Sequence, residues 1–133
     1  MTTKPLATLP GRPCPIAAAL DLVGERWALL VVREIALGET RFSDIVAGTG
    51  APRDRIAARL KALEAAGVVS RTPYHDGPTR YEYRLTKSGG ELIPVLDALL
   101  EWGKHHAVAP DDPDRQRKYR PMSELRECKR PLS

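Results

Sequence analysis

Two short helical segments joined by a glycine-containing turn lie in the middle of the chain and constrain the fold more than any other feature. The first segment covers residues 42–47 and has Phe42, Ile45 and Val46 as its apolar side. The second covers 52–66, where Ile56, Leu60 and Leu63 repeat at helical spacing. Gly48-Thr49-Gly50 supplies the turn between the segments, and Gly67 ends the second one. The pattern predicts a helix-turn-helix.

The character of the sequence changes directly after Gly67. Val68–Thr72 is rich in β-branched residues, His75–Pro78 has turn composition, and Arg80–Leu85 again has strand preference. This order predicts a β-hairpin placed behind the helix-turn-helix, where a wing spanning 73–80 would lie.

Helical spacing also marks segments on both sides of this unit. Residues 15–23 and 25–37 are expected to be helices, and Thr86 is expected to cap a long last helix that bends at Pro94. The predicted fold class is α+β, mostly α: a winged helix-turn-helix with a two-stranded β-hairpin wing and a long C-terminal dimerisation helix.

The length of 133 residues fits one domain with extensions. Residues 1–13 contain three prolines and are expected to form an N-terminal arm. Residues 14–107 carry the winged helix-turn-helix domain. Residues 108–133 are a basic, proline-rich C-terminal extension.

The net charge of +4 is concentrated in one part of the chain. Residues 51–87 hold eight basic and four acidic side chains, so this window alone accounts for the excess. A basic excess on a helix-turn-helix and its hairpin favours a polyanionic partner, and we expect double-stranded DNA.

The candidate DNA contacts lie on the second helix of the motif and on the hairpin. Arginines on the helix can contact phosphates or pair with guanine, although a solvated helix face has the same composition. Asp54 is expected to interact with the helix dipole, with pairing to an arginine or to a cytosine amino group as alternatives. Arg80 at the hairpin tip is expected in the minor groove, or else as an edge charge that prevents aggregation. The full set is Arg41, Pro52, Arg53, Asp54, Arg55, Arg59, Arg71, Thr79 and Arg80.

Several motifs together resemble the HxlR family of transcriptional regulators. They are CPIAAALDLVGERWALLVVREI from Cys14, the RFSDI block, RIAARLKALEAAGVVSR, and PTRYEYRLTKSGGEL with the later Trp102-Gly103. The resemblance implies a dimeric, MarR-like winged-helix regulator that binds a palindromic operator. It also implies a response to oxidants, electrophiles or small metabolites, so an oxidant or a small molecule is the expected inducer.

Cys14 directly precedes Pro15 and is therefore expected at the start of the first long helix. Helix N-termini stabilise a thiolate and make the sulfur more reactive. The family resemblance implies that a cysteine at this position senses oxidation, whereas an inert, half-buried cysteine is the alternative. The other cysteine, Cys128, lies in the extension.

The apolar face of the last helix is wider than the core of a small domain needs. We therefore expect a homodimer, with an interface built from Ile16, Leu92, Leu96, Leu99 and Trp102. A winged-helix module that uses this face to bind other proteins is the rival function, and a regulator that responds to a small molecule without a thiol switch is a second alternative.

No sequence pattern indicates catalysis. The chain has no Walker loop, no catalytic Ser/His/Asp set and no paired-cysteine zinc pattern. His105 and His106 point in different directions on a helix, so no metal site and no cofactor are expected. The absence of a catalytic motif predicts that the protein is not an enzyme. The sequence also has no apolar run long enough for a signal peptide or a membrane span, which predicts a cytoplasmic protein.

Overall fold

The computed structural model describes residues 3–74 and 80–115. The described elements follow the order predicted from the sequence, except that two helices, α5 and α6, replace the single predicted last helix and a short 3₁₀ turn, η1, precedes α1. In chain order they are η1 Leu6–Thr8, α1 Pro15–Val23, α2 Ala28–Ala36, α3 Phe42–Thr49, α4 Arg53–Ala65, β1 Val69–Tyr74, β2 Arg80–Leu85, α5 Lys87–Gly90 and α6 Ile93–His106.

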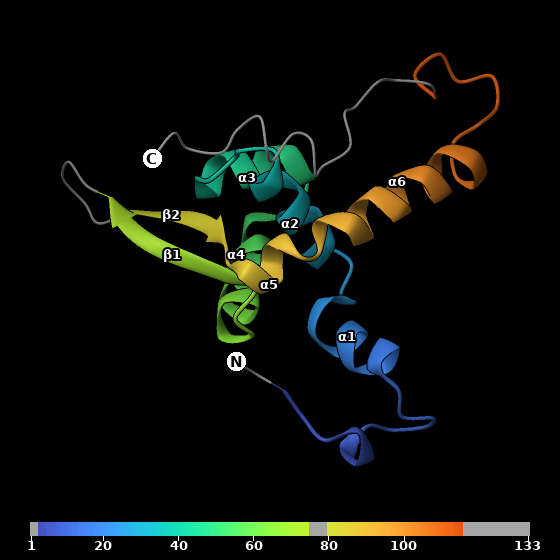
Figure 1. Ribbon diagram of the computed structural model, residues 1–133. Helices are drawn as coiled ribbons and strands as arrows, with labels where there is room; N and C mark the ends of the chain where they lie inside the picture. The colour runs from blue at the N-terminus through green and yellow to red at the C-terminus, as the bar shows by residue number, and fades with distance from the viewer. Residues whose placement is uncertain (1–2, 75–79, 116–133) are drawn as a thin grey trace.

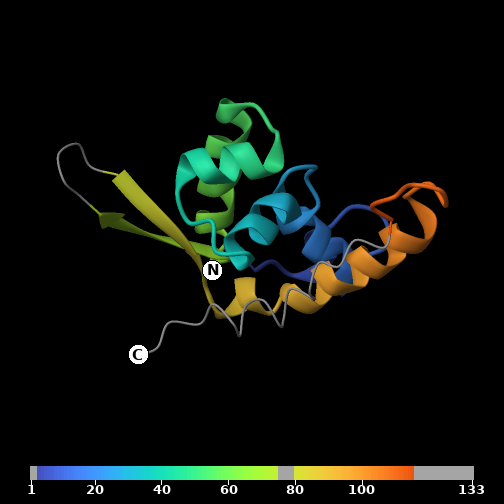
Figure 2. The same cartoon turned by 90° about the horizontal axis from the view of Figure 1, so that it is seen from above.

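The helices α3 and α4 lie on one side of α2, and α6 runs along the other side (Figure 2). The β-hairpin projects from the helical body at one end of the molecule, whereas the end of α6 marks the opposite end (Figure 1). This arrangement is a winged helix-turn-helix with a long C-terminal helix, so the fold class predicted from the sequence is confirmed.

The core is aliphatic and centres on α2, as the scarcity of aromatic residues requires. Val31 and Val32 of α2, Ile45 of α3 and Ile56 of α4 are fully buried. Leu60, Leu63 and Ile93 complete it from α4 and α6. The apolar positions that the helical spacing selected on α3 and α4 therefore do face inward.

The turn between α3 and α4 depends on a residue with a left-handed backbone. Gly50 has φ +73° and its amide donates to the Val46 carbonyl at 3.0 Å, which ends α3. The Thr49 hydroxyl donates to the Ile45 carbonyl at 2.9 Å, and Ala51 is buried beneath the turn. Pro52 then occupies the N-cap position of α4 in an extended conformation.

The hairpin is an antiparallel pair with Val69 opposite Leu85 and Tyr74 opposite Arg80. An isolated bridge between Arg41 and Glu82 ties the start of α3 to β2. The Tyr83 amide also donates to the Thr40 carbonyl at 2.8 Å. The middle of β2 is thus held to the start of the helix-turn-helix.

The long last helix differs from the sequence prediction at its start. Thr86 does act as an N-cap, accepting from the Gly89 amide at 3.2 Å, but it caps only the short α5. The chain turns at Glu91 and Leu92, and α6 begins at Ile93. Pro94 lies in the first turn of α6, where no partner for its missing N–H is needed, so it does not bend the helix.

Both ends of the described chain pack on the domain. Lys4 of the N-terminal arm forms an ion pair with Asp21 of α1. Arg115 donates from Nε to the Lys104 carbonyl at 3.1 Å, which folds the residues after α6 back on the helix. None of the helices in the described ranges combines the length and the apolar character needed to cross a membrane.

Candidate nucleic-acid interface

The outward face of α4 carries a carboxylate, a small side chain and a cation. Asp54, Ala58 and Lys61 recur at intervals of four and three residues and are all exposed, opposite the buried Ile56 and Leu60. Small residues on an exposed helix face allow the backbone to come close to a second surface, and the width of a DNA major groove matches a helix.

Lys61 is a basic residue on this face that the sequence prediction did not select. The signal was present in the spacing, because Lys61 lies opposite the apolar stripe of α4, whereas the prediction followed the arginines. Asp54 lies in the first turn of α4, the end of the helix at which a carboxylate interacts favourably with the helix dipole.

Arg53 and Arg55 lie on different edges of α4. The Arg53 guanidinium lies over the Phe42 ring of α3, 4.9 Å from its centroid. Arg55 is exposed and lines an open groove on the side of the α1–α2 turn. Cationic side chains therefore flank the outward face on both sides.

Arg59 is not an outward residue. Its Nε lies 2.7 Å from Glu25 Oε2, and only 30% of its side chain is exposed. The helical position places it beside the α1–α2 turn, so the ion pair holds Arg59 against the same chain. Sequence spacing alone did not reveal this partner, because Glu25 is far from Arg59 in the chain.

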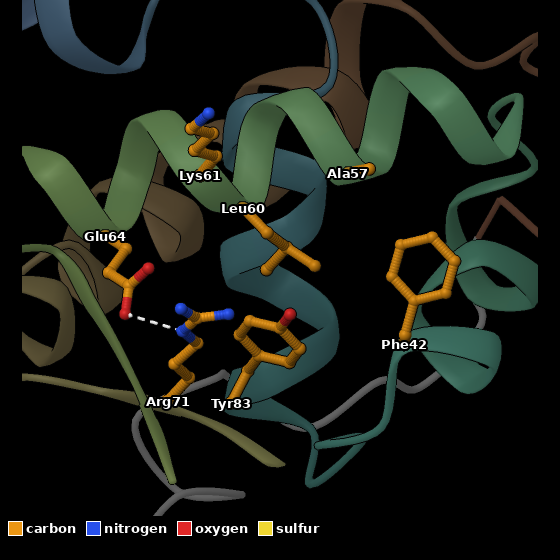
Figure 3. Close-up of a pocket in the computed structure, with 7 residues that line it drawn as sticks. All are labelled: Phe42, Ala57, Leu60, Lys61, Glu64, Arg71 and Tyr83. Carbon is orange, nitrogen blue, oxygen red and sulfur yellow. Dashed lines mark ion pairs between the residues drawn. The ribbon is translucent and has the colours of Figure 1, made fainter. Parts of the chain in front are cut away.

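A pocket of about 400 Å³ separates α4 from the hairpin. Arg71 from β1 and Tyr83 from β2 lie side by side in it, and Phe42 of α3 lies at its other end (Figure 3). The Arg71 Nε is 3.2 Å from Glu64 Oε2 of α4, and its guanidinium also lies 4.1 Å from the Tyr81 ring centroid. Arg71 therefore joins the wing to α4.

Burial raises the pKa of the Tyr83 hydroxyl in this pocket, and the nearby positive charge of Arg71 opposes the shift. The hydroxyl is therefore neutral at physiological pH. Because the pKa is raised in the folded state, the neutral form is favoured by folding, and this contribution to stability is lost only as the pH rises above the ordinary tyrosine range.

The remaining candidate contacts lie toward the tip of the hairpin, where Tyr74 pairs with Arg80. The Arg41 guanidinium is 4.3 Å from the Tyr74 ring centroid and 3.8 Å from Glu82 Oε1, and more than half of its side chain is exposed. Arg80 is exposed at the first position of β2. Thr79 lies outside the described residues.

Cys14 is a half-buried free cysteine at the N-cap position of α1. Its carbonyl accepts from the Ala18 amide at 3.1 Å, so the helix begins where the sequence placed it. Cys128 lies outside the described residues.

The five predicted interface residues divide into two groups. Leu96 is 8% exposed and Leu92 packs on the core, so both lie against the helices of their own chain. Ile16 of α1 is 72% exposed, and Leu99 and Trp102 of α6 are 49% and 62% exposed. The structure adds Val95 and Leu20, which the prediction did not include, to these exposed apolar stripes.

Across 3–74 and 80–115, no three histidine, cysteine, aspartate or glutamate side chains come together as a metal site would require. His105 lies 3.5 Å from Glu101, and His106 is near the Trp102 ring. The two adjacent histidines thus have different surroundings.

The family described as HxlR-like helix-turn-helix matches residues 22–111. The chain belongs to this family. The resemblance drawn from the sequence motifs is therefore confirmed, and the chain has the helix-turn-helix fold of this family.

Individual relatives are also described as helix-turn-helix proteins. The chain is 40% identical over 98 residues to an uncharacterized HTH-type transcriptional regulator of Mycobacterium tuberculosis. The matched segment covers 74% of this chain and 62% of the relative. It thus spans less than two thirds of that protein. It is also 38% identical over 91 residues to the HTH-type regulator YvaP of Bacillus subtilis, covering 67% of this chain and 84% of the relative.

Solved structures of similar proteins include a redox regulator and a transcriptional regulator in its reduced form. The redox regulator HypR in its reduced form has a TM-score of 0.65 at 29% identity, covering 71% of this chain and 94% of HypR. The reduced form of the transcriptional regulator YodB from B. subtilis has a TM-score of 0.60 at 30% identity, covering 74% of this chain and 98% of YodB.

Proposed function

We propose that this protein is a homodimeric, sequence-specific regulator that binds a palindromic DNA operator, with α4 in the major groove and the hairpin beside it. The outward face of α4 carries the proposal, because Ala58 and Lys61 leave the helix free to approach base edges while cations flank it. Each subunit would bind one half-site, and the two half-sites would be about one helical turn, roughly 34–36 Å, or a multiple apart. Such a regulator acts where the genomic DNA is, in the cytoplasm.

Within this proposal, 1–13 is an arm, 14–107 is the DNA-binding and dimerising unit, and 108–133 is an extension that adds basic charge. Arg41 and Arg80 are assigned to the DNA backbone on the wing side. Arg71 contributes indirectly, since its ion pair with Glu64 fixes the wing against α4.

The double variant Arg53→Ala with Lys61→Ala tests the assignment of α4. Both residues are exposed, so the variant should keep its thermal midpoint, but operator affinity should fall at least about a hundredfold because a dimer loses four cations. Equilibrium binding by fluorescence anisotropy at fixed salt measures the loss. Lys104→Ala is the comparison: it removes a cation in the last turn of α6, away from α4, and should have the smaller effect on operator affinity. Unchanged affinity in the double variant would exclude α4 as the DNA-reading helix.

The exposed apolar stripe of α6 supports the dimer. Val95, Leu99 and Trp102 recur at intervals of four and three residues, and Ile16 and Leu20 form a similar pair on α1. Exposed apolar surface of this kind on a small domain favours an isologous contact with a second copy.

Leu99→Glu should convert the dimer to a monomer, because it places a carboxylate on the stripe without disturbing the core, whereas Leu99→Met should remain dimeric. Sedimentation equilibrium at micromolar concentration distinguishes the two states. A wild-type protein that sediments as a monomer would refute the proposed homodimer.

Oxidation of Cys14 is the proposed signal. Two observations favour it: the sulfur lies at the start of α1, and the fold is similar to that of HypR, a redox regulator solved in reduced and oxidised forms. The thiolate would attack one oxygen atom of hydrogen peroxide and break the O–O bond, which gives a sulfenic acid and a hydroxide ion that takes a proton from the solvent to become water.

Mild peroxide treatment should lower the operator affinity of the wild type about tenfold or more and leave Cys14→Ser unchanged. Cys128→Ser serves as the matched control and should respond like the wild type. Anisotropy titrations before and after treatment, followed by reduction with dithiothreitol, give the comparison. If Cys14→Ser loses affinity as the wild type does, the thiol switch is wrong and a small-molecule signal becomes the better explanation.

A further inference from the structure

An open groove of about 500 Å³ lies on the edge of α4 that faces away from the hairpin. One wall comes from the turn between α1 and α2, and the other comes from the start of α4. The lining residues are Glu25, Arg26, Trp27, Pro52, Arg55 and Arg59.

The groove holds three guanidinium groups and one carboxylate, so its lining carries a formal excess of two positive charges. Glu25 is fixed at both oxygens, since Oε1 accepts from the Trp27 amide and Oε2 is 2.7 Å from Arg59 Nε. This arrangement orients Arg59 and uses the only carboxylate of the groove.

The other two guanidinium groups have no carboxylate partner among the described residues. Arg26 lies over the Trp27 ring at 4.4 Å from its centroid, which leaves its N–H edge free to donate. Arg55 is exposed on α4, one turn before Arg59. Two unneutralised, planar donors beside flat apolar walls suit a tetrahedral oxyanion, and guanidinium binds phosphate oxygens in pairs.

The position of the groove relative to α4 indicates which part of the DNA would reach it. With the outward face of α4 in a major groove, the edge that bears Arg55 meets one of the two strands that border it, and the α1–α2 turn lies beside that edge. The hairpin lies on the other side of α4 (Figure 2).

We propose that Arg26 and Arg55 bind a phosphodiester group of the DNA backbone in this groove, with Arg59 held beside them by Glu25. The inference rests on the proposed operator binding and adds Arg26 to it as a phosphate contact. The site fixes the position of α4 on the duplex from the side opposite the wing and carries no base specificity.

Arg26→Gln in the full-length protein tests the proposal through salt dependence. Log affinity falls linearly with log salt concentration. The loss of a phosphate contact makes this fall less steep, reducing the magnitude of the slope by about 0.9 for each subunit and hence by about 1.8 for a dimer on a palindrome. Affinity at low salt should fall about tenfold or more, whereas the sequence selected from a random duplex library should stay the same. Arg26→Lys keeps the charge and should retain most of the slope, which a purely structural role for the stack on Trp27 would not explain. Lys104→Gln, the same charge change near the end of α6, should have the wild-type slope.

The outcomes separate this inference from the function on which it rests. If the wild type selects no sequence, the operator-binding function fails, whatever Arg26 does. If the wild type binds its operator and Arg26→Gln keeps the same slope, only the phosphate site is wrong. A changed operator preference in Arg26→Gln would indicate a base contact and would also overturn the assignment.

Free inorganic phosphate is the other source of the same chemistry. Titration of the DNA-free protein with phosphate, followed by the arginine Nε–H signals in NMR spectra, detects such binding. Phosphate binding that depends on Arg26, together with an unchanged DNA slope in Arg26→Gln, would assign the groove to a soluble anion and overturn the DNA-backbone proposal.

Discussion

Gly89→Ala should unfold the domain or lower its thermal midpoint by on the order of 15 °C. A Cβ at this position would lie 2.2 Å from the backbone oxygen of Val68 and 3.2 Å from two side-chain carbons of Leu85. The Val68 carbonyl is held by the amide and the hydroxyl of Thr86, and the adjacent Gly67 carbonyl by the Ser88 hydroxyl, so neither can move aside alone. A clash with fixed backbone in a packed core costs about 3 kcal/mol or more in the free energy of unfolding.

Gly103→Ala is the matched control, because a Cβ there meets nothing within 4 Å and the residue lies within α6. It should raise stability by up to about 1 kcal/mol through helix propensity. Thermal unfolding followed by circular dichroism measures both variants. If Gly89→Ala melts at the same temperature as the wild type, the close packing of α5 against the start of β1 is wrong.

Ala58→Glu should abolish operator binding, lowering affinity on the order of a hundredfold or more, while leaving the fold intact. Ala58 is exposed at the centre of the outward face of α4, so a glutamate is accommodated in solution. In the complex its carboxylate would lie at the groove and repel phosphates in both half-sites, and each disrupted position in a site costs about 1–3 kcal/mol.

Ala58→Ser keeps the residue small and neutral, and it should bind nearly as well as the wild type. Anisotropy titrations at one salt concentration compare the three proteins, and circular dichroism verifies that they are folded. Equal binding by Ala58→Glu would show that α4 does not enter the groove.

The helical part of the fold could be predicted because local signals and packing agree there. Ile56, Leu60 and Leu63 repeat at helical spacing and are all buried, and Gly50 ends α3 in the left-handed conformation that a turn requires. The start of the last helix was harder to predict, because Thr86 and Pro94 each mark a helix start. Only the turn at Glu91 and Leu92 separates the two, and the Gly89-Gly90 pair directly before it is the local signal that the sequence prediction did not use.

The candidate site could be predicted at the level of elements but not of individual contacts. The basic charge does lie on α4 and the hairpin, yet Arg59 and Arg71 pair with Glu25 and Glu64 of the same chain. The Glu25–Arg59 pair joins positions that only the tertiary fold brings together. The same limit applies to Leu96, whose burial depends on how α6 packs against α2.

Selection of duplexes from a random library by the wild type and by Ala58→Glu, followed by a salt titration of the selected sequence, tests the central claim most directly. We predict that the reduced wild-type protein enriches a palindrome, that its affinity falls steeply with salt, and that Ala58→Glu enriches nothing. A wild type that selects no sequence, or an Ala58→Glu variant that selects the same palindrome with equal affinity, would contradict operator recognition by α4.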